Sequence, residues 1–204
     1  MRKLTALLLF PLMSGCAMIL GENNHLMPET PAQSRLPVAA RGIEVATVDL
    51  PLYAADAEMA VANDSGVVSM SSRNIWADEP PRAITQRLAS QLSQRVSAAV
   101  AAEPWPMLSR PDLRISVKVD KLVGDDDSLM FSGQYFVTAA NTGTYEGAYN
   151  FSYDIPYPNP QGNVYQNIAA AQGAALSDLA DDMAQDLSMI PAGSVVSSGP
   201  APLF

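Results

Sequence analysis

The chain of 204 residues has one cysteine, one histidine and few charged side chains, which make up 16% of it. A single cysteine cannot form an intrachain disulfide, so a packed core must hold the fold together. With His25 as the only histidine, there is no His/Cys set for a zinc site, and a Ser-His-Asp or Cys-His catalytic arrangement is disfavoured. Basic residues are also scarce, 12 against 21 acidic ones, for a net charge of −9. This balance argues against attraction by charge to nucleic acid or to an anionic lipid surface.

The cysteine, Cys16, follows a short apolar leader. Two basic residues precede an apolar run at 4–12, and Ser14 and Gly15 stand directly before Cys16. These are the parts of a secretory signal, and the run is far shorter than the ~20 residues that a membrane-spanning helix needs. The segment resembles the lipobox of bacterial lipoproteins, although Met13 stands where leucine is more usual. The resemblance implies a signal peptide at 1–15 and lipid attachment at Cys16; the alternative is an ordinary signal peptide with an unremarkable cysteine.

Lipid attachment would decide where the protein works. Two or more acyl chains anchor a protein stably, because each buried methylene contributes ~0.8 kcal/mol. Ala17 follows the cysteine, and by resemblance to lipoprotein sorting rules this implies the periplasmic face of the outer membrane.

The composition divides the mature chain into three parts. Residues 16–40 contain several prolines and asparagines without a hydrophobic period, which predicts the lipidated cysteine followed by a flexible tether. Residues 41–190 are expected to form one folded domain. Residues 191–204 are rich in Pro, Gly and Ser and are predicted to be a disordered tail.

Two segments have the one-sided apolar pattern of amphipathic helices. Residues 81–101 carry an apolar side chain at every fourth position, and residues 164–187 carry a second apolar stripe. Pro80 and Pro81 suit a helix start, and Asp78 is a candidate cap for that helix.

Alternating apolar and polar residues predict strands. The predicted strands are 43–48, a hairpin of 59–62 and 67–70, and the three longer segments 113–119, 129–137 and 145–155. We therefore expect an α+β fold, with a mostly antiparallel sheet and two amphipathic helices packed on one face.

Aromatic residues are the first candidates for a functional surface. Trp76 and Trp105 flank the first predicted helix and are candidate interface residues, although packing of the helix ends explains them as well. Tyr145, Tyr149 and Tyr153 share one face of a strand, where sheet core is the simpler interpretation and a lipid-contacting surface the alternative.

Acidic residues are the second candidates. The run 125–127 lacks the alternating ligands of a calcium loop and is predicted to be a solvated turn. Asp178, Asp181 and Asp182 on the last helix are predicted to form an exposed acidic face, with contact to a partner's basic surface left open. No motif supports catalysis by these carboxylates, so we expect no enzyme activity, no metal site and no cofactor.

Five segments, taken in order, carry a family resemblance. They are Val48–Tyr53, Arg73–Asp78, the first helix with Glu103–Trp105, Pro111–Val117 and Ile168–Leu187. Each is weak alone, but their order and spacing over residues 43–188 resemble the ABC-type transport auxiliary lipoproteins, the paraquat-inducible protein C (PqiC/YmbA) group. Pro80, Tyr135 and Phe136 depart from the family's usual residues.

The resemblance implies a function that composition does not show. Such proteins are subunits of intermembrane lipid transport systems that support envelope integrity, acting as a docking platform or conduit end. The implied partners are an MCE-domain (PqiB-like) protein or ABC transporter components, together with further copies of the chain in a homo-oligomeric ring. A structural or assembly lipoprotein of the outer membrane, without a transporter partner, is the alternative.

Overall fold

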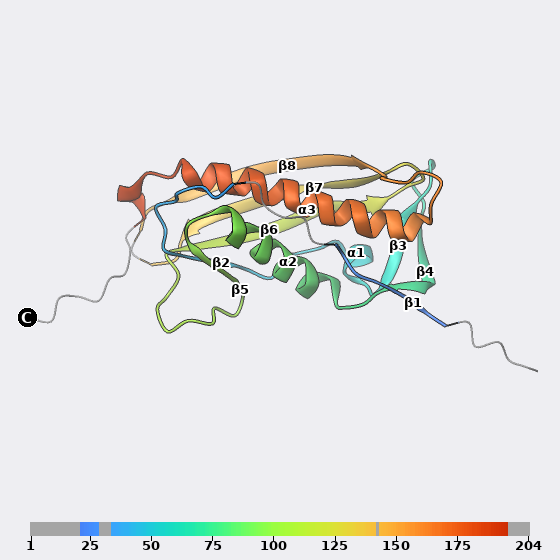
Figure 1. Ribbon diagram of the computed structural model, residues 1–204, viewed down its shortest axis with the longest axis horizontal. Coiled ribbons are helices and arrows are strands. Elements are labelled where there is room, and N and C mark those ends of the chain that lie inside the picture. The colour runs from blue at the N-terminus through green and yellow to red at the C-terminus, as the bar shows by residue number, and fades with distance from the viewer. Residues whose placement is uncertain (1–20, 29–33, 142, 196–204) are drawn as a thin grey trace, which may run out of the picture.

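The computed structural model describes residues 21–28, 34–141 and 143–195, and these form two layers (Figure 1). One layer is a sheet, and the other consists mainly of two long helices lying over one of its faces. In chain order the elements are β1 (Asn23–His25), β2 (Gly42–Val45), α1 (Leu52–Ala55), β3 (Glu58–Ala62), β4 (Val68–Trp76), α2 (Pro80–Arg95), β5 (Ala99–Ala102), β6 (Leu113–Gly124), β7 (Ser128–Ala139), β8 (Glu146–Pro156), α3 (Val164–Ser188) and the 3-10 helix η1 (Ala192–Ser194). The α+β class expected from the sequence is confirmed.

The longest strands follow the predicted alternation. β6, β7 and β8 pair antiparallel in chain order, and the register pairs Ile115 with Val137 and Phe131 with Tyr153. The predicted hairpin of β3 and β4 is also present. Its turn is closed by the Asn63 carboxamide, which accepts the backbone N–H of Val67 at 2.9 Å, and by Gly66 at φ +77°. A positive φ is accessible to glycine without steric cost.

The sheet as a whole is mixed, which corrects the expectation of a mostly antiparallel one. β2 pairs parallel with both β5 and β6, and β1 pairs parallel with β4. The connection from β2 to β5 is long, through α1, β3, β4 and α2, which is the kind of crossover that parallel neighbours require. Side-chain alternation has the same period in both kinds of pairing, so it does not report strand direction.

The first long helix is shorter than its apolar spacing predicts. It ends at Arg95, and Val96 is extended with φ −123° and ψ 157°. Val100, which continues the four-residue spacing, lies instead in β5 beside Ile43 of β2. Pairing with a buried strand therefore overrides the helical pattern. Asp78 is not the cap of this helix, since its carboxylate accepts the N–H of Glu79 at 2.7 Å and lies one residue too early.

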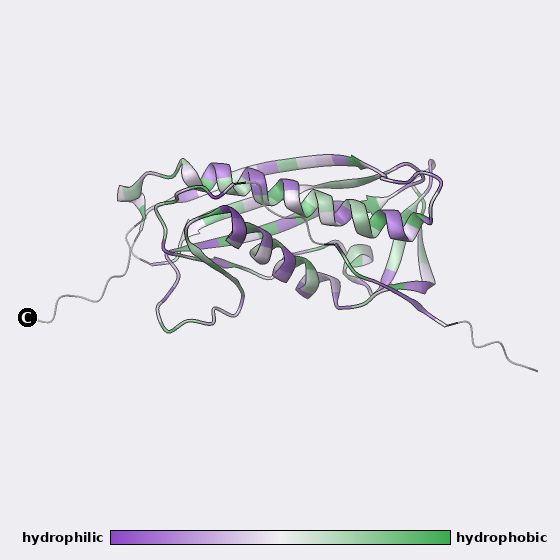
Figure 2. Ribbon diagram, viewed as in Figure 1, coloured by the Kyte–Doolittle hydropathy of each residue, from purple (hydrophilic) through white to green (hydrophobic). Residues whose placement is uncertain are grey.

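The core lies between the helices and the sheet. α2 and α3 pack together over it, and their green apolar positions alternate with purple polar ones in Figure 2. The predicted stripe of α3 is confirmed, because the following members of it are at most 3% exposed: Ile168, Gln172, Leu176, Leu179, Met183 and Leu187. The helix starts at Asn163, whose side chain accepts the backbone N–H groups of Tyr165 and Gln166.

Much of the predicted tether is instead part of the domain. Within residues 21–28 and 34–40, β1 extends the sheet beside β4, Met27 is buried, and the Leu36 N–H donates to the Arg95 carbonyl at 2.7 Å. Three residues are enough to pair with a free sheet edge, but they are too few to show a hydrophobic period. Residues 16–20 and 29–33 lie outside the described part of the chain.

The beginning of the predicted disordered tail is also ordered. η1 follows α3, Val195 is only 6% exposed, and the Ser194 carbonyl accepts the backbone N–H of Thr144. Residues 196–204 lie outside the described residues.

Candidate interaction surface

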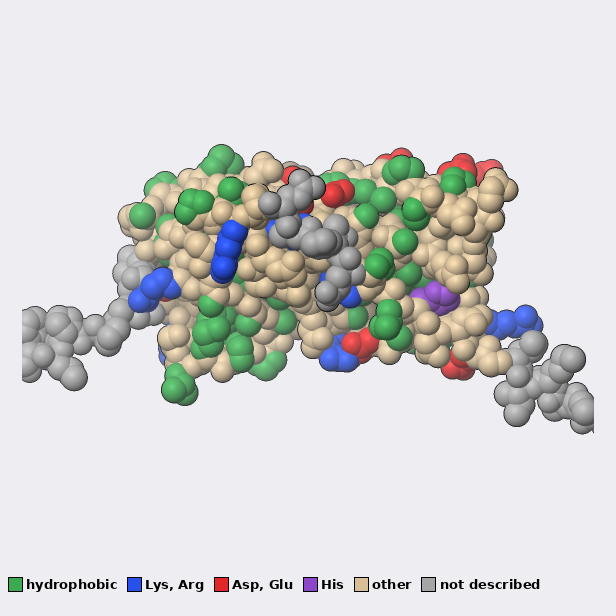
Figure 3. Space-filling model, in the orientation of Figure 1, with side chains coloured by type: hydrophobic (Ala, Val, Ile, Leu, Met, Phe, Trp, Pro, Cys, Tyr) green, Lys and Arg blue, Asp and Glu red, His purple; other side chains and the backbone are tan. Residues whose placement is uncertain are grey.

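An apolar loop projects from the sheet between β5 and β6, at the lower left of Figure 1. This loop, residues 103–112, contains five consecutive apolar residues, Pro104 to Leu108. Leu108 is fully exposed and Met107 is 45% exposed. Hydrophobic side chains protrude over this part of the molecule in Figure 3. A run of exposed apolar residues is a liability for a soluble surface unless it has a function, so the loop is a candidate contact surface.

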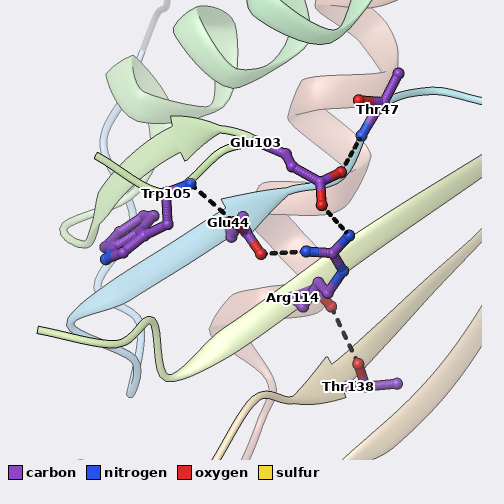
Figure 4. A network of polar contacts seen from close by, with 6 residues as sticks. All are labelled: Glu44, Thr47, Glu103, Trp105, Arg114 and Thr138. Atoms are coloured by element: carbon purple, nitrogen blue, oxygen red, sulfur yellow. Dashed lines mark hydrogen bonds and ion pairs between the residues drawn. The ribbon is translucent and has the colours of Figure 1, made fainter. Parts of the chain in front are cut away.

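A charged network holds the first end of the loop (Figure 4). Arg114 on β6 donates to the Glu44 carboxylate on β2 and, at 2.7 Å, to the Glu103 carboxylate. The other oxygen of Glu44 accepts the backbone N–H of Trp105 at 3.0 Å, and the other oxygen of Glu103 accepts that of Thr47 at 3.1 Å. One guanidinium therefore joins two strands to the start of the loop.

The electrostatics keep Glu103 and Arg114 of this network ionised at neutral pH. The hydrogen bond from Arg114, helped by the N–H of Thr47, holds the pKa of Glu103 below its ordinary value. In return, the hydrogen bond to Glu103 raises the pKa of the Arg114 guanidinium. Glu44 is only 8% exposed. A carboxylate so far from water needs the opposite charge beside it, so Arg114 neutralises a position that would otherwise be costly.

Buried Asp112 holds the second end of the loop. Its carboxylate accepts the backbone N–H of Arg41 at 2.8 Å, and its own N–H donates to the Gly42 carbonyl at 2.8 Å. The Asn141 side chain also donates to the Pro111 carbonyl at 2.6 Å. The second end of the loop is thus tied to the start of β2 and to Asn141, which follows β7.

Trp105 stabilises the loop by a hydrogen bond across it and by packing against Gly42. Its indole N–H donates to the Ser109 carbonyl at 2.5 Å, and its ring lies so close to Gly42 that a Cβ there would meet it at 3.1 Å. Trp105 and Met107 help to line a shallow hollow of about 290 Å³, together with Arg110. The exposed Leu108 is therefore presented by a fixed loop.

The two predicted tryptophans lie in different surroundings. Trp76 ends β4, is half-buried against the core, and donates its backbone N–H to the Ala57 carbonyl at 2.8 Å. Trp105 is half-buried at the base of the loop. They do not form one site.

Sequence reasoning missed two features of this surface. The exposed residues Met107 and Leu108 had a usable signal, because they belong to an apolar run between charged residues. The Glu44–Arg114 pair had none, because its members are far apart in the sequence.

The tyrosine stripe lies beneath α3. The Tyr153 hydroxyl donates to Asp182 at 2.5 Å, and the Tyr145 and Tyr149 hydroxyls are 2.6 Å apart. Tyr135 on β7 donates in the same way to Asp186. Burial, followed by the hydrogen bond to Asp182, raises the pKa of Tyr153. The hydroxyls of Tyr153 and Tyr135 thus bond to α3, and those of Tyr145 and Tyr149 bond to each other, rather than forming an open lipid-contacting face.

The predicted acidic face of α3 is partly used inside the protein. Arg95 of α2 is 2% exposed and donates to Asp181 at 2.6 Å, to Ser177 at 2.6 Å and to the Gln91 side chain at 2.6 Å. Asp181 itself is half exposed.

The acidic turn 125–127 closes on itself, because the Asp125 carboxylate accepts two backbone N–H groups at 2.9 Å. Within the described residues no group of His, Cys, Asp and Glu is arranged to hold a metal ion.

Comparison with known proteins assigns the chain to a family. The sequence profile of the ABC-type transport auxiliary lipoprotein component matches residues 25–184. The chain belongs to this family. The match begins within β1, which agrees with β1 being part of the domain.

Solved structures share the fold of this auxiliary lipoprotein at low sequence identity. An uncharacterised protein is 17% identical with a TM-score of 0.62, over 82% of this chain and 99% of its own. Protein XCC0632 from Xanthomonas campestris is 14% identical with a TM-score of 0.61, over 81% of this chain and 93% of its own. No curated protein matches the chain.

Within the described residues, no helix has both the length and the hydropathy to cross a membrane.

Proposed function

We propose that this auxiliary lipoprotein is a lipid-anchored subunit of an intermembrane lipid transport system, held at the periplasmic face of the outer membrane. The observation that carries the proposal is the family match over residues 25–184, which runs from the last residue of β1 through most of α3. The lipobox-like segment before Cys16 supports the anchor. Cys16 lies outside the described residues.

The geometry favours a docking role over catalysis. The conspicuous polar groups of the domain bind one another: Arg114 binds Glu44 and Glu103, and Arg95 binds Asp181. The loop 103–112 exposes apolar Met107 and Leu108, which suit contact rather than chemistry. We therefore assign the protein no reaction of its own and give it the role of a docking platform or conduit end.

The partners follow from the same proposal. They are an MCE-domain (PqiB-like) protein or ABC transporter components, and further copies of the chain in a ring. One domain fills its own core, so any apolar path for lipid would have to be lined by the assembly.

The test is affinity purification of the tagged full-length lipoprotein from mild detergent, with mass spectrometry of the partners and the native mass of the complex. An MCE-domain protein or permease in the eluate, with a self-associated ring, is the expected result. A lone monomer without a transport protein would move the protein to the structural lipoproteins of the outer membrane.

The lipid anchor has a separate test in the Cys16→Ser variant. Without the thiol no diacylglycerol can be attached, so we expect loss of acylation by mass and loss of retention in the outer-membrane fraction. Retention of the unacylated variant in that fraction would contradict the anchor.

A further inference from the structure

The ordered position of β1 shortens the reach of the lipid anchor. A flexible tether over 16–40 could stretch to ~80 Å, at ~3.3 Å for each residue. The first described residue is Gly21, and β1 begins at Asn23, already paired with β4. Only 21 − 16 = 5 residue steps then separate Cys16 from the folded domain, which is at most ~18 Å of extended chain. An acylated Cys16 would hold the β1 end of the domain close to the membrane.

The apolar loop and the start of β1 both reach the lower side of the molecule as it is seen in Figure 1, the loop at the left and β1 at the right. A membrane that runs along this side and holds the β1 end would meet the loop as well. The loop carries two adjacent exposed apolar residues, Met107 and Leu108.

We propose that loop 103–112 is a second membrane contact, in which Met107 and Leu108 enter the interface of the lipid leaflet that holds Cys16. The proposal rests on the lipid anchor of the proposed function. Its occupant is the bilayer surface itself, chosen because the chain between Cys16 and Gly21 is too short to let the domain stand away from it.

The chemistry of the loop fits a lipid interface. Met107 and Leu108 are apolar and exposed, and Trp105 lies half-buried behind them. Arg41 and Arg110 flank the hollow at the base, where their guanidinium groups would lie at the level of lipid phosphates. The net charge of −9 disfavours attraction of the whole protein to anionic lipid. The attraction must therefore come from apolar insertion, with the anchor supplying a high local concentration.

The network at the base makes the loop ready for such a contact. Arg114 and Asp112 fix the two ends, and the Trp105 indole bonds across to Ser109. A loop already ordered in the free protein loses little further conformational entropy on insertion.

The experiment places a probe at the loop tip of the intact lipoprotein. In the acylated protein Cys16 has no free thiol, so Leu108→Cys introduces a unique site for an environment-sensitive fluorophore. The control is Ser152→Cys, exposed on β8 at the upper edge of Figure 1. Each labelled lipoprotein is reconstituted into vesicles of phosphatidylethanolamine and phosphatidylglycerol that carry bromine on their acyl chains. We expect quenching at 108 to exceed that at 152 at least about twofold, because interfacial apolar groups lie ~5–10 Å into the headgroup and acyl boundary.

The other outcomes separate this proposal from the proposed function. Protein that stays on the vesicles with equal quenching at 108 and 152 would overturn the loop contact and leave the anchor standing. Protein that does not stay on the vesicles would overturn both. A label at 108 that becomes buried in detergent with rising protein concentration would show that a second copy covers the loop, which also overturns the membrane contact.

Discussion

Single charged residues decide how the two helices and the sheet are joined. Arg95 is 2% exposed, yet it carries a full charge between α2 and α3. Its guanidinium meets Asp181, Ser177 and Gln91, so most of its donors are satisfied. A buried guanidinium is tolerated only with such partners, and removal of one partner is costly because the charge stays behind.

At the residue scale, Asp181→Asn should lower the free energy of unfolding by about 2 kcal/mol, the usual cost of losing a hydrogen bond to a charged group. Asp178→Asn, three positions earlier on the same helix, is the matched control. Urea unfolding of both variants measures the difference. Equal destabilisation by the two changes would contradict a specific role for the Arg95–Asp181 pair.

The effect of Asp178→Asn on stability should itself depend on pH. Partial desolvation against the protein, and then the nearby charges of Asp181 and Asp182, raise the pKa of Asp178 above its ordinary value of 3.8, although the side chain stays largely exposed. The folded protein therefore favours protonated Asp178, a stabilisation present below pH 3.8 and lost as pH rises through the raised pKa. Asp178→Asn should stabilise the protein at neutral pH, by less than about 1 kcal/mol because the side chain is exposed. Below pH 3.8, where Asp178 is protonated in both the folded and the unfolded chain, this gain in the free energy of unfolding should vanish.

At the scale of elements, β6 organises the molecule. It pairs with β2 and β7, and it supplies Arg114 to the loop network. Its register with β7 shifts between Val119 and Lys121. At this irregularity Gly133 of β7 faces Val119 so closely that a Cβ would lie 2.2 Å from the Lys118 carbonyl oxygen. Backbone cannot yield as a flexible side chain can, so this approach requires glycine.

Gly133→Ala should accordingly destabilise the protein by about 2 kcal/mol or more, as overpacking does when backbone must shift. Ser132→Ala, one residue away on the opposite face of β7, should change stability little. Thermal and urea unfolding of the pair provide the comparison. A stable Gly133→Ala protein would mean that β6 can move at its bulge without cost.

The loop network has its own prediction. Arg114→Gln removes the cation from buried Glu44 and from Glu103, so we expect a loss of about 2 kcal/mol and a loosened loop. Faster amide exchange at Trp105 and a red shift of its emission would report the loosening. Lys118→Gln is the matched control, because Lys118 is exposed on the same face of β6. An unchanged exchange rate in Arg114→Gln would show that the loop is held by Asp112 and Trp105 alone.

At the scale of the whole molecule, residues 21–28 dock onto the sheet and the core. β1 adds to the edge of the sheet beside β4, and Met27 fills a place against the core. The Arg87 guanidinium donates to the Met27 carbonyl at 2.5 Å. Residues 21–28 are therefore part of the folded domain.

Neighbouring residues allow a sharp test of this docking. Met27 is 8% exposed and Leu26 is 74% exposed. Met27→Asp would bury a charge without a partner and should release β1, which we expect to raise the rate of proteolysis within residues 21–28 about tenfold or more. Leu26→Asp should leave that rate unchanged. Equal cleavage of both variants and of the unaltered protein would mean that β1 stays docked without Met27.

The sequence by itself determined the α+β class, the antiparallel run of β6 to β8 and the buried stripe of α3. It also predicted Cys16 as the lipid attachment site. Periodicity identified the long strands and the helical stripe, because long segments repeat one buried face many times. The antiparallel direction of β6 to β8 followed from the short connections between them. The same periodicity does not tell which strand lies beside which, or in which direction, so the parallel pairing of β2 with β5 and β6 appeared only in the tertiary structure.

Tertiary structure alone decided the short strands and the ion pairs between residues far apart in the sequence. β1 and β5 have three and four residues, too few to show a period, and each forms because a neighbouring strand offers free hydrogen-bonding groups. Arg95 with Asp181, and Arg114 with Glu44, are more than sixty residues apart along the chain, and no local rule joins them. Local sequence reports which face of an element is buried, whereas these pairs depend on which elements the whole fold brings together.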